Sequence, residues 1–173
     1  TSDGSIPLIM AAQKGHLEIV RYLVQTGGAD ANKLAHDGHT PLYGAALVGH
    51  LDVVKFLVRI GKADVNSKND HGATALHIAM GEGHTDVVKF LIRNGAQDTS
   101  FTGLHSGEIL NVDDLANRVG NQTLTDYVAS KRCSVCNKLC KPQKCKGCME
   151  VGYCSSACQK RDWPEHKKVC TKC

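Results

Sequence analysis

Apolar residues in the first hundred positions follow the period of an amphipathic helix. Val53, Val54 and Leu57 fall at i, i+1 and i+4, which places them in one stripe along a helix. The small residues Ala45 and Ala46 come shortly before this stripe and allow a preceding helix to pack closely. The pattern therefore predicts a short helix followed by an amphipathic one, packed together as a helical hairpin.

Helix ends are marked by capping residues. Thr40 and Thr74 can cap a helix N-terminus through the hydroxyl group, and Pro41 suits the first helical position. Gly49 is placed to end the first helix of its hairpin. The second helices are broken by glycine-containing segments that lead to projecting turns, at residues 27–30, 61–64 and 95–98.

This pattern returns every 34 residues, most plainly in three glycine–histidine pairs at residues 15–16, 49–50 and 83–84. Self-similarity at such a period is typical of a repeat stack, in which each unit buries its apolar face against the next. The histidines His16, His50 and His84 invite a metal-binding or catalytic interpretation. We favour a structural one, in which they hydrogen-bond the backbone of neighbouring units, and we interpret His77 in the same way.

The units resemble the ankyrin repeat. The resemblance is carried by D-G-H-T-P-L at residues 37–42, the alanine pair, and G-H-L-D-V-V-K-F-L at residues 49–57. It implies an all-α ankyrin-repeat solenoid of three units, at about residues 1–33, 34–68 and 69–98. The first unit lacks the threonine and histidine of the pattern, and the chain does not begin with methionine. We therefore expect a fragment or a processed form, and further upstream repeats stay open.

A degenerate fourth unit is expected after residues 99–108, a stretch rich in Gly, Ser and Thr that we interpret as a loop. Leu124 and Tyr127 lie 37 residues after Val87 and Phe90. Terminal repeats of a stack are atypical and need a polar outer face. Such a face is predicted from Asp113, Asp114, Asn117, Gln122 and Asp126. We therefore interpret residues 99–130 as a degenerate capping repeat and linker.

Eight residues near the C-terminus fall at the spacings of metal ligands. They follow the order C-x2-C, C-x2-C, C-x3-C, H-x3-C, as Cys133, Cys136, Cys145, Cys148, Cys154, Cys158, His166 and Cys170. Pairs this close let one chain segment supply two ligands, and eight ligands complete two tetrahedral zinc ions. Four protein ligands per ion leave no open position for water, so we predict structural zinc.

A disulfide-stapled secreted domain is the alternative use of the nine cysteines. Their spacing, their confinement to the last quarter of the chain and their odd number favour zinc. Cys140 and Cys173 are left over, and we interpret both as spare thiols, although Cys140 could compete for the first zinc site.

The histidine is the seventh of the eight ligands, which separates this order from RING and PHD fingers. The order resembles the MYND finger from Cys133 to Cys170, and Tyr153 and Trp163 fit the same family. The resemblance implies a finger at residues 131–173 with two interleaved zinc sites. The first would be formed by Cys133, Cys136, Cys154 and Cys158, and the second by Cys145, Cys148, His166 and Cys170. Spacing alone leaves this pairing open.

Many MYND fingers dock short proline-rich segments, often with a Pro-x-Leu-x-Pro core, in a shallow groove. By resemblance, Gln159 and Trp163 match the groove positions, although Trp163 could instead pack between the zinc sites. Lys146 stands where other members carry a small polar residue such as serine. We therefore expect Lys146 to alter the peptide preference.

Charge is divided unevenly along the chain. Residues from 131 onward hold eleven of the 21 Lys and Arg residues but three of the 17 Asp and Glu residues. A basic zinc domain can bind nucleic acid. The finger lacks the helix pattern of zinc modules that read the major groove, and only Tyr153 and Trp163 could stack on bases. A solvated lysine-rich face is therefore the simpler interpretation.

Residues 1–130 contain no nucleophile elbow, P-loop, dinucleotide-binding glycine pattern or H-E-x-x-H motif, so we predict no enzyme. Resemblance to ankyrin proteins implies instead a concave face of first helices and turns. We expect this face to bind a partly apolar, partly basic protein. Its candidate residues include Tyr43, Leu47, Val48, His77 and Glu82.

The prediction is a monomeric, non-enzymatic adaptor that joins a protein on the ankyrin face to a proline-rich segment on the finger. The alternative is a regulatory fragment of a larger enzyme, or a transcriptional co-regulator, because MYND fingers also accompany SET-domain methyltransferases and a prolyl hydroxylase. Reduced cysteines, with no signal peptide or transmembrane run, predict the cytoplasm or nucleus and no membrane partner.

Overall fold

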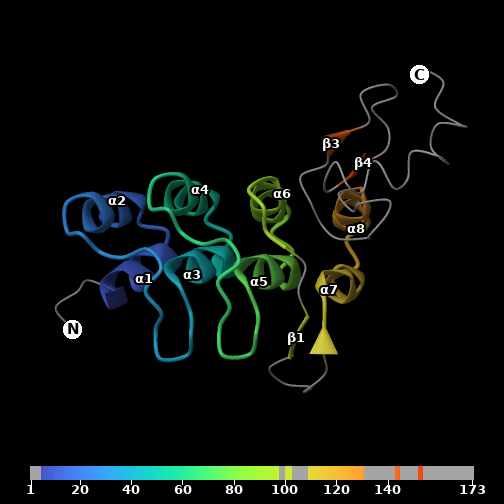
Figure 1. Cartoon of the computed structure of the whole chain (residues 1–173), viewed down its shortest axis with the longest axis horizontal. Coiled ribbons are helices and arrows are strands. Elements are labelled where there is room, and N and C mark those ends of the chain that lie inside the picture. Colours follow the sequence, from blue (N-terminus) through green and yellow to red (C-terminus); the bar gives the residue numbers. More distant parts are fainter. Residues whose placement is uncertain (1–4, 98–99, 103–108, 131–142, 145–151, 154–173) are drawn as a thin grey trace, which may run out of the picture.

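The computed structural model describes residues 5–97, 100–102, 109–130, 143–144 and 152–153. Helices in this part form successive hairpins (Figure 1). The first three hairpins are α1 (Ser5–Gln13) with α2 (Leu17–Gln25), α3 (Pro41–Val48) with α4 (Leu51–Arg59), and α5 (Ala75–Gly81) with α6 (Thr85–Arg93). A fourth, α7 (Val112–Val119) with α8 (Gln122–Ala129), follows a short antiparallel pair of strands, β1 (Phe101–Thr102) and β2 (Ile109–Leu110).

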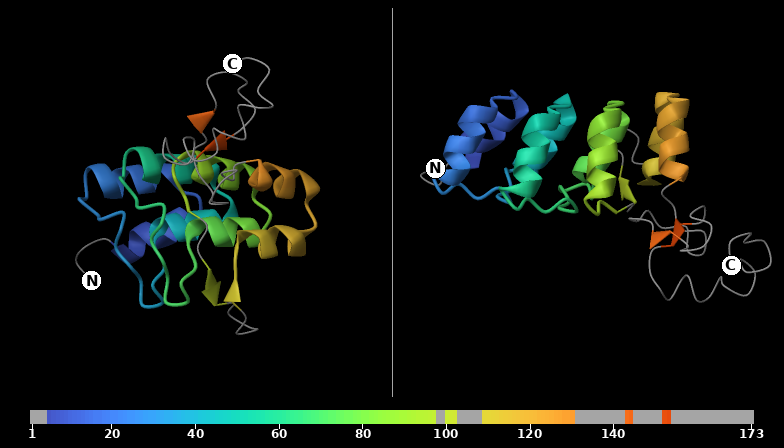
Figure 2. Two further views of the ribbon diagram at one scale, coloured as in Figure 1. Left: turned by 45° about the vertical axis from the view of Figure 1, so that its right-hand side comes forward. Right: turned by 90° about the horizontal axis from the view of Figure 1, so that it is seen from above.

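The helices lie in two layers. The first helices α1, α3, α5 and α7 pack side by side in one layer, and the second helices α2, α4 and α6 pack in the other (Figure 2). The turns between hairpins project along one side of the stack (Figure 1). This arrangement confirms the expected all-α ankyrin-type solenoid. In the part of the chain that the structure describes, no helix is long and apolar enough to cross a membrane.

Local chemistry explains the boundaries of α3. The Thr40 hydroxyl oxygen accepts a hydrogen bond from the Tyr43 backbone N–H at 3.1 Å, and Pro41 is the first helical residue. Gly49 ends the helix with φ of 87°, a backbone conformation that an L-residue with a Cβ rarely adopts. The predicted cap and stop of this helix are confirmed.

The core lies between the two layers and continues from unit to unit. Leu8, Leu42 and Leu76 hold the same position in successive first helices, and each is at most 1% exposed. Val53 and Leu57 of the predicted stripe on α4 are both 0% exposed. Because each unit buries its face against the next, the stack is stabilised mainly by contacts between units.

The glycine–histidine pairs join neighbouring units. The His50 ring lies against Gly15 of the unit before, where an added Cβ would come within 2.6 Å of the ring. The His84 ring lies against Gly49 in the same way, and its Nε2 is 3.1 Å from the Leu47 carbonyl oxygen. The structural interpretation is therefore confirmed for His84.

A hydrogen-bonded ladder of asparagine side chains also joins the units. Asn32 donates from Nδ2 to the Lys62 carbonyl oxygen at 3.2 Å, and its Oδ1 accepts from the Asp64 N–H at 2.7 Å. Asn66 makes the equivalent bonds to the next unit, with the Gly95 carbonyl oxygen and the Gln97 N–H. Sequence analysis missed this ladder, although the 34-residue spacing of the two asparagines carries its signal.

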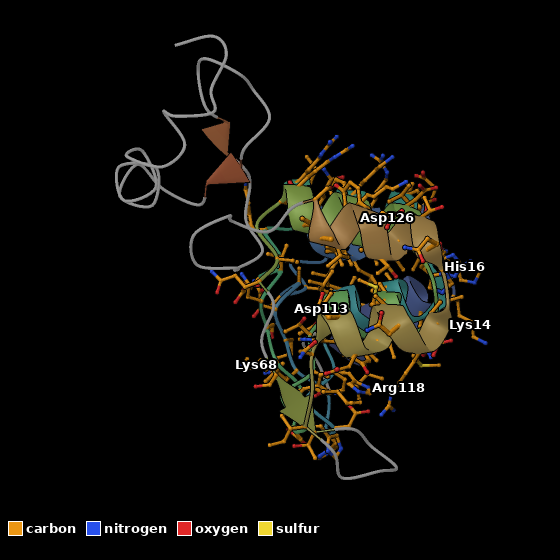
Figure 3. The ribbon with its side chains drawn as sticks, turned by 90° about the vertical axis from the view of Figure 1, so that its right-hand side faces the viewer. Lys14, His16, Lys68, Asp113, Arg118 and Asp126 are labelled. Atoms are coloured by element: carbon orange, nitrogen blue, oxygen red, sulfur yellow. The ribbon has the colours of Figure 1, made fainter. Side chains whose placement is uncertain are left out.

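The fourth hairpin closes the described stack. Asn111 caps α7 by accepting from the Asp113 and Asp114 N–H groups, and the Asp114 carboxylate accepts from the Asn111 N–H at 2.8 Å. Asp114 is thus half-buried in a capping box. Asp126 on α8 is exposed, and the end-on view shows Asp113 and Asp126 on this hairpin (Figure 3). Of the five residues predicted for the polar outer face, Asn117, Gln122 and Asp126 are exposed, whereas Asp113 and Asp114 are half-buried.

Residues 101–102, within the loop expected at residues 99–108, form a short strand in the structure. Phe101 pairs with Leu110, and Thr102 with Ile109, in the β1–β2 ladder. The Thr102 N–H also donates to the His71 carbonyl oxygen, in the turn between α4 and α5, at 2.9 Å. A two-residue strand is too short to show an alternating pattern, so this pairing depends on the neighbouring turn.

Candidate functional site

The candidate ankyrin face consists of the layer of first helices and the turns between hairpins. Tyr43, Leu47 and Val48 lie on α3, His77 lies on α5, and Glu82 follows α5 directly. Val48 is 46% exposed and Glu82 is exposed, whereas Leu47 is half-buried. Tyr43 is 5% exposed and His77 is 2% exposed, so these two side chains do not belong to the exposed surface on which we expected them.

His77 is buried because it completes the cap of α5. Its Nδ1 accepts a hydrogen bond from the Thr74 backbone N–H at 3.0 Å and lies 3.0 Å from the Thr74 hydroxyl oxygen. Its ring lies 4.6 Å, centroid to centroid, from the ring of Phe101. Phe101 was not singled out in the sequence, because only the β1 pairing brings it back over the third unit. These contacts support a structural role for His77.

Tyr43 is covered by His39. The two rings stack with centroids 4.1 Å apart and planes 11° from parallel, and Nδ1 of His39 lies 2.7 Å from Oδ2 of Asp37. Asp37 and Glu82 are open to solvent on this part of the face, and Val48 is an exposed apolar residue on α3. This surface can offer carboxylates and a hydrophobic contact to a partner.

The same cluster sets the ionisation of Tyr43. Burial raises the pKa of Tyr43 above its ordinary value of 10.0, and the charges of Asp37 and Glu82 raise it further. The folded state thus holds the phenol proton more tightly than the unfolded state does. The resulting stabilisation is present in full below the unfolded pKa and is lost as the pH rises through the folded pKa.

In an alkaline titration followed by phenolate absorbance, we expect Tyr43 to ionise above the ordinary tyrosine pKa of 10.0. Tyr43→Phe should remove this late step from the titration curve. A Tyr43→Phe variant that loses an early step instead would contradict the burial argument.

The eight predicted zinc ligands and the predicted groove residues Lys146, Gln159 and Trp163 lie outside the described residues. Within their segment the structure describes β3 (Gln143–Lys144) and β4 (Gly152–Tyr153), which pair antiparallel with Gln143 opposite Tyr153. The donor set of seven thiolates and one imidazole suits Zn²⁺. In the described ranges, no group of three or more His, Cys, Asp or Glu side chains is arranged to hold a metal ion.

Comparison with known families accounts for both halves of the chain. A family model for ankyrin repeats (three copies) matches residues 1–69 and 60–147. A family model for the MYND finger matches residues 131–170. The two matches overlap at residues 131–147, and α8, the last described helix, ends at Ala129, before the overlap.

Curated relatives match over short segments. The chain is 50% identical over 40 residues to zinc finger MYND domain-containing protein 10 homolog of Drosophila melanogaster, covering 23% of this chain and 9% of the relative. It is 51% identical over 39 residues to Dauer abnormal formation protein 25 of Caenorhabditis elegans, covering 22% and 10%. It is 39% identical over 57 residues to SET domain and MYND-type zinc finger protein 6 of Schizosaccharomyces pombe, covering 32% and 12%. The chain thus spans about a tenth of the length of these relatives.

Ankyrin repeats and MYND fingers are protein-interaction domains, and the MYND finger binds zinc. The matched residues, the stacked hairpins and the order of the cysteines agree. The chain belongs to the ankyrin-repeat family and carries a MYND zinc finger at its C-terminal end.

Proposed function

We propose that this chain is a non-enzymatic, monomeric adaptor with two protein-binding surfaces, working in the cytoplasm or nucleus. The three ankyrin units would occupy residues 1–98, the capping repeat and linker 99–130, and the finger 131–173. The observation that carries the proposal is the presence of two interaction domains of different families in one short chain. Each domain would hold one partner, so the adaptor would bring the two together.

The finger would hold two structural zinc ions in interleaved sites. Cys133, Cys136, Cys154 and Cys158 would bind the first ion, and Cys145, Cys148, His166 and Cys170 the second. In this assignment Cys145 and Cys154, which directly follow β3 and β4 in the sequence, would bind different ions.

The finger would bind extended, proline-rich segments through Gln159 and Trp163. A tryptophan ring stacks well on proline and leucine, and an extended proline-rich peptide loses little entropy on binding. Lys146 would add a positive charge beside this groove. It would favour peptides with an acidic residue near the Pro-x-Leu-x-Pro core.

Trp163 is the only tryptophan, so its fluorescence reports on this site. We expect a saturable change when a Pro-x-Leu-x-Pro peptide is added to zinc-loaded protein, and none with a scrambled peptide. Trp163→Ala should weaken peptide binding, measured by calorimetry, by about tenfold or more, the loss typical of an aromatic residue that anchors an interface. Lys146→Ser should weaken binding of an acidic peptide more than that of a neutral one.

Two results would count against peptide binding. One is an unchanged Trp163 fluorescence when the Pro-x-Leu-x-Pro peptide is added to protein whose bound zinc has been measured directly. The other is sequence-independent affinity for single-stranded DNA that falls steeply with salt, which would indicate a nucleic-acid-binding finger.

The ankyrin face would bind a second protein with basic and apolar residues. Asp37 and Glu82 supply exposed carboxylates, and Val48 supplies an apolar contact. Tyr43 and His77 would act indirectly, because both are buried and shape the surface around them.

A second candidate is a regulatory part of a larger enzyme or a transcriptional co-regulator. It is favoured by the Schizosaccharomyces pombe relative, whose name combines a SET domain with a MYND-type finger. A catalytic domain in a longer transcript of the same gene would support this candidate over the adaptor.

A further inference from the structure

A shallow groove runs between the second helices α2 and α4, and we call it the α2–α4 groove. These helices lie side by side in the layer opposite the first helices (Figure 2). The groove is lined from α2 and from α4 with the residue after it, by Leu17, Arg21, Gln25, Asp52, Lys55, Phe56, Arg59 and Ile60. A helix of 9 residues is about 13 Å long, so the groove can hold about four residues of an extended peptide.

The groove has an apolar part. Phe56 is 5% exposed and lies beneath the guanidinium of Arg21, which is 5.3 Å from the centroid of its ring. Ile60 follows Phe56 by one helical turn and is 53% exposed. Leu17, at the start of α2, is half-buried. An apolar side chain of a ligand therefore finds a contact at Ile60, at the end of the groove where α4 stops.

Charge is divided along the groove. Arg21 and Lys55 lie in the middle of their helices and Arg59 lies in the last turn of α4, and all three are exposed. Asp52 lies in the first turn of α4, at the other end. The middle and the C-terminal end of the groove are thus basic, and the N-terminal end is acidic.

Local roles account for other cations of the second helices but leave Lys55 over. Arg59 complements the dipole of its helix and covers the Phe90 ring at 5.4 Å. Lys89, 34 residues after Lys55, covers the Tyr127 ring at 5.6 Å. Lys55 lies outside the last turn, and in the described part of the chain no ring or carboxylate lies within contact distance of its ammonium. Its charge is available to a ligand.

We propose that the α2–α4 groove binds an acidic segment of a partner protein, whose carboxylates meet Arg21, Lys55 and Arg59. An apolar side chain of the segment would pack on Ile60. Asp52 would repel a carboxylate at the opposite end and so fix the direction of the segment.

Carboxylates within the same layer favour a protein segment over nucleic acid or an anionic lipid surface. Glu18, Asp52 and Asp86 lie in the first turns of α2, α4 and α6. A phosphate backbone or an anionic membrane binds best to a continuous basic surface, which these carboxylates interrupt.

The α2–α4 groove is separate from the candidate ankyrin face, which carries exposed carboxylates at Asp37 and Glu82. The two layers of the stack would therefore select partners of opposite charge. The proposal goes beyond the adaptor function and is independent of it, because it needs neither the finger nor the layer of first helices.

The test measures the fluorescence anisotropy of labelled seven-residue glutamate peptides, in which one leucine occupies each position in turn, added to the full, zinc-loaded chain. We expect saturable binding that weakens as salt is raised, and none with the matching glutamine peptides. Lys55→Gln together with Arg59→Gln should weaken binding by about tenfold or more. Asp52→Asn should strengthen it by about threefold, because a like charge is removed.

The charge-matched control is Lys14→Gln together with Lys68→Gln. Lys14 directly follows α1 and Lys68 lies in the turn between α4 and α5, both outside the groove (Figure 3). This variant removes the same two charges and should change the affinity by less than about twofold. Because loss of Arg59 also uncovers Phe90, Lys55→Glu alone serves as a second groove variant and should weaken binding by about tenfold.

Equal losses in the groove variants and the control would overturn the proposal, since they would show an effect of net charge instead of a site. Absence of saturable binding to the original chain would overturn it as well. Binding of single-stranded DNA or phosphatidylserine vesicles through Lys55 and Arg59, without binding of the peptides, would assign this surface to nucleic acid or a membrane instead.

Discussion

Removal of zinc is expected to unfold residues 131–173 and to leave the ankyrin stack folded. A segment of about 40 residues seldom builds a sufficient apolar core without metals or disulfides. Structural zinc supplies about 10–16 kcal/mol of apparent binding energy per site in comparable fingers, and this energy is folding energy. The stack has its own core, from Leu8 to Val128, and contributes no cysteine to the donor set. Chelation should thus change Trp163 fluorescence while the helical circular dichroism of the stack is retained.

Single substitutions separate ligands from spare thiols. Cys145→Ser or Cys154→Ser should each lower the measured zinc content from two ions per chain toward one, whereas Cys140→Ser and Cys173→Ser should leave it unchanged. Because Cys145 and Cys154 are assigned to different ions, the double variant should lose both. Zinc loss in Cys140→Ser would show that Cys140 is a ligand and would require a new assignment of the first site. A chelated chain that loses its helical signal would contradict the independence of the stack.

Substitution of Gly49 by alanine is expected to destabilise the stack by about 2–3 kcal/mol. Left-handed backbone costs an L-residue about 1–2 kcal/mol, and loss of the part-buried hydrogen bond that His84 makes adds about 1 kcal/mol. The Cβ of the alanine would lie 2.6 Å from Nδ1 of His84, so the ring must leave its place against the preceding unit. Folded domains are stable by only about 5–15 kcal/mol, so this loss should be plain in urea denaturation followed by circular dichroism.

Two controls isolate the contact between units. Gly28 also has a positive φ, of 65°, but an added Cβ would meet nothing within 4 Å, so Gly28→Ala should show the backbone cost alone, about 1–2 kcal/mol. In a double-mutant cycle, His84→Ala should relieve the clash, and Gly49→Ala should then cost about as much as Gly28→Ala. Equal losses for Gly49→Ala and Gly28→Ala in the original chain would show that the His84 contact adds nothing.

Local patterns were sufficient to predict the helical hairpins. The cap at Thr40, the stop at Gly49 and the stripe at Val53 and Leu57 act within one or two turns of helix, so their signals lie close together in the chain. The spacing of the eight C-terminal ligands is local in the same sense. It predicts the zinc chemistry, although the ligand pairing stays a proposal.

The candidate ankyrin face could be predicted less well. Val48 on α3 and Glu82 directly after α5 were expected on the surface, and both are exposed. Tyr43 and His77 were also expected there, and both are buried. His39 covers Tyr43 from the preceding turn, and Phe101 covers His77 from β1. These covering contacts join a helix to an irregular segment, where no periodic pattern indicates which side chain will fold back.

The sequence by itself determined the repeat, the hairpin of each unit, the change from an ankyrin stack to a cysteine-rich finger and the type of metal that such a donor set binds. These features follow from helix period, capping and ligand spacing, which act over a few residues. Only the tertiary structure decided which repeated residues bind a neighbouring unit. His84 and Tyr127 find their partners there, whereas His16 and Tyr22, at the matching positions of the first unit, are exposed. The physical reason is that a repeated position has the same chemistry in every unit, but its burial depends on the unit stacked beside it.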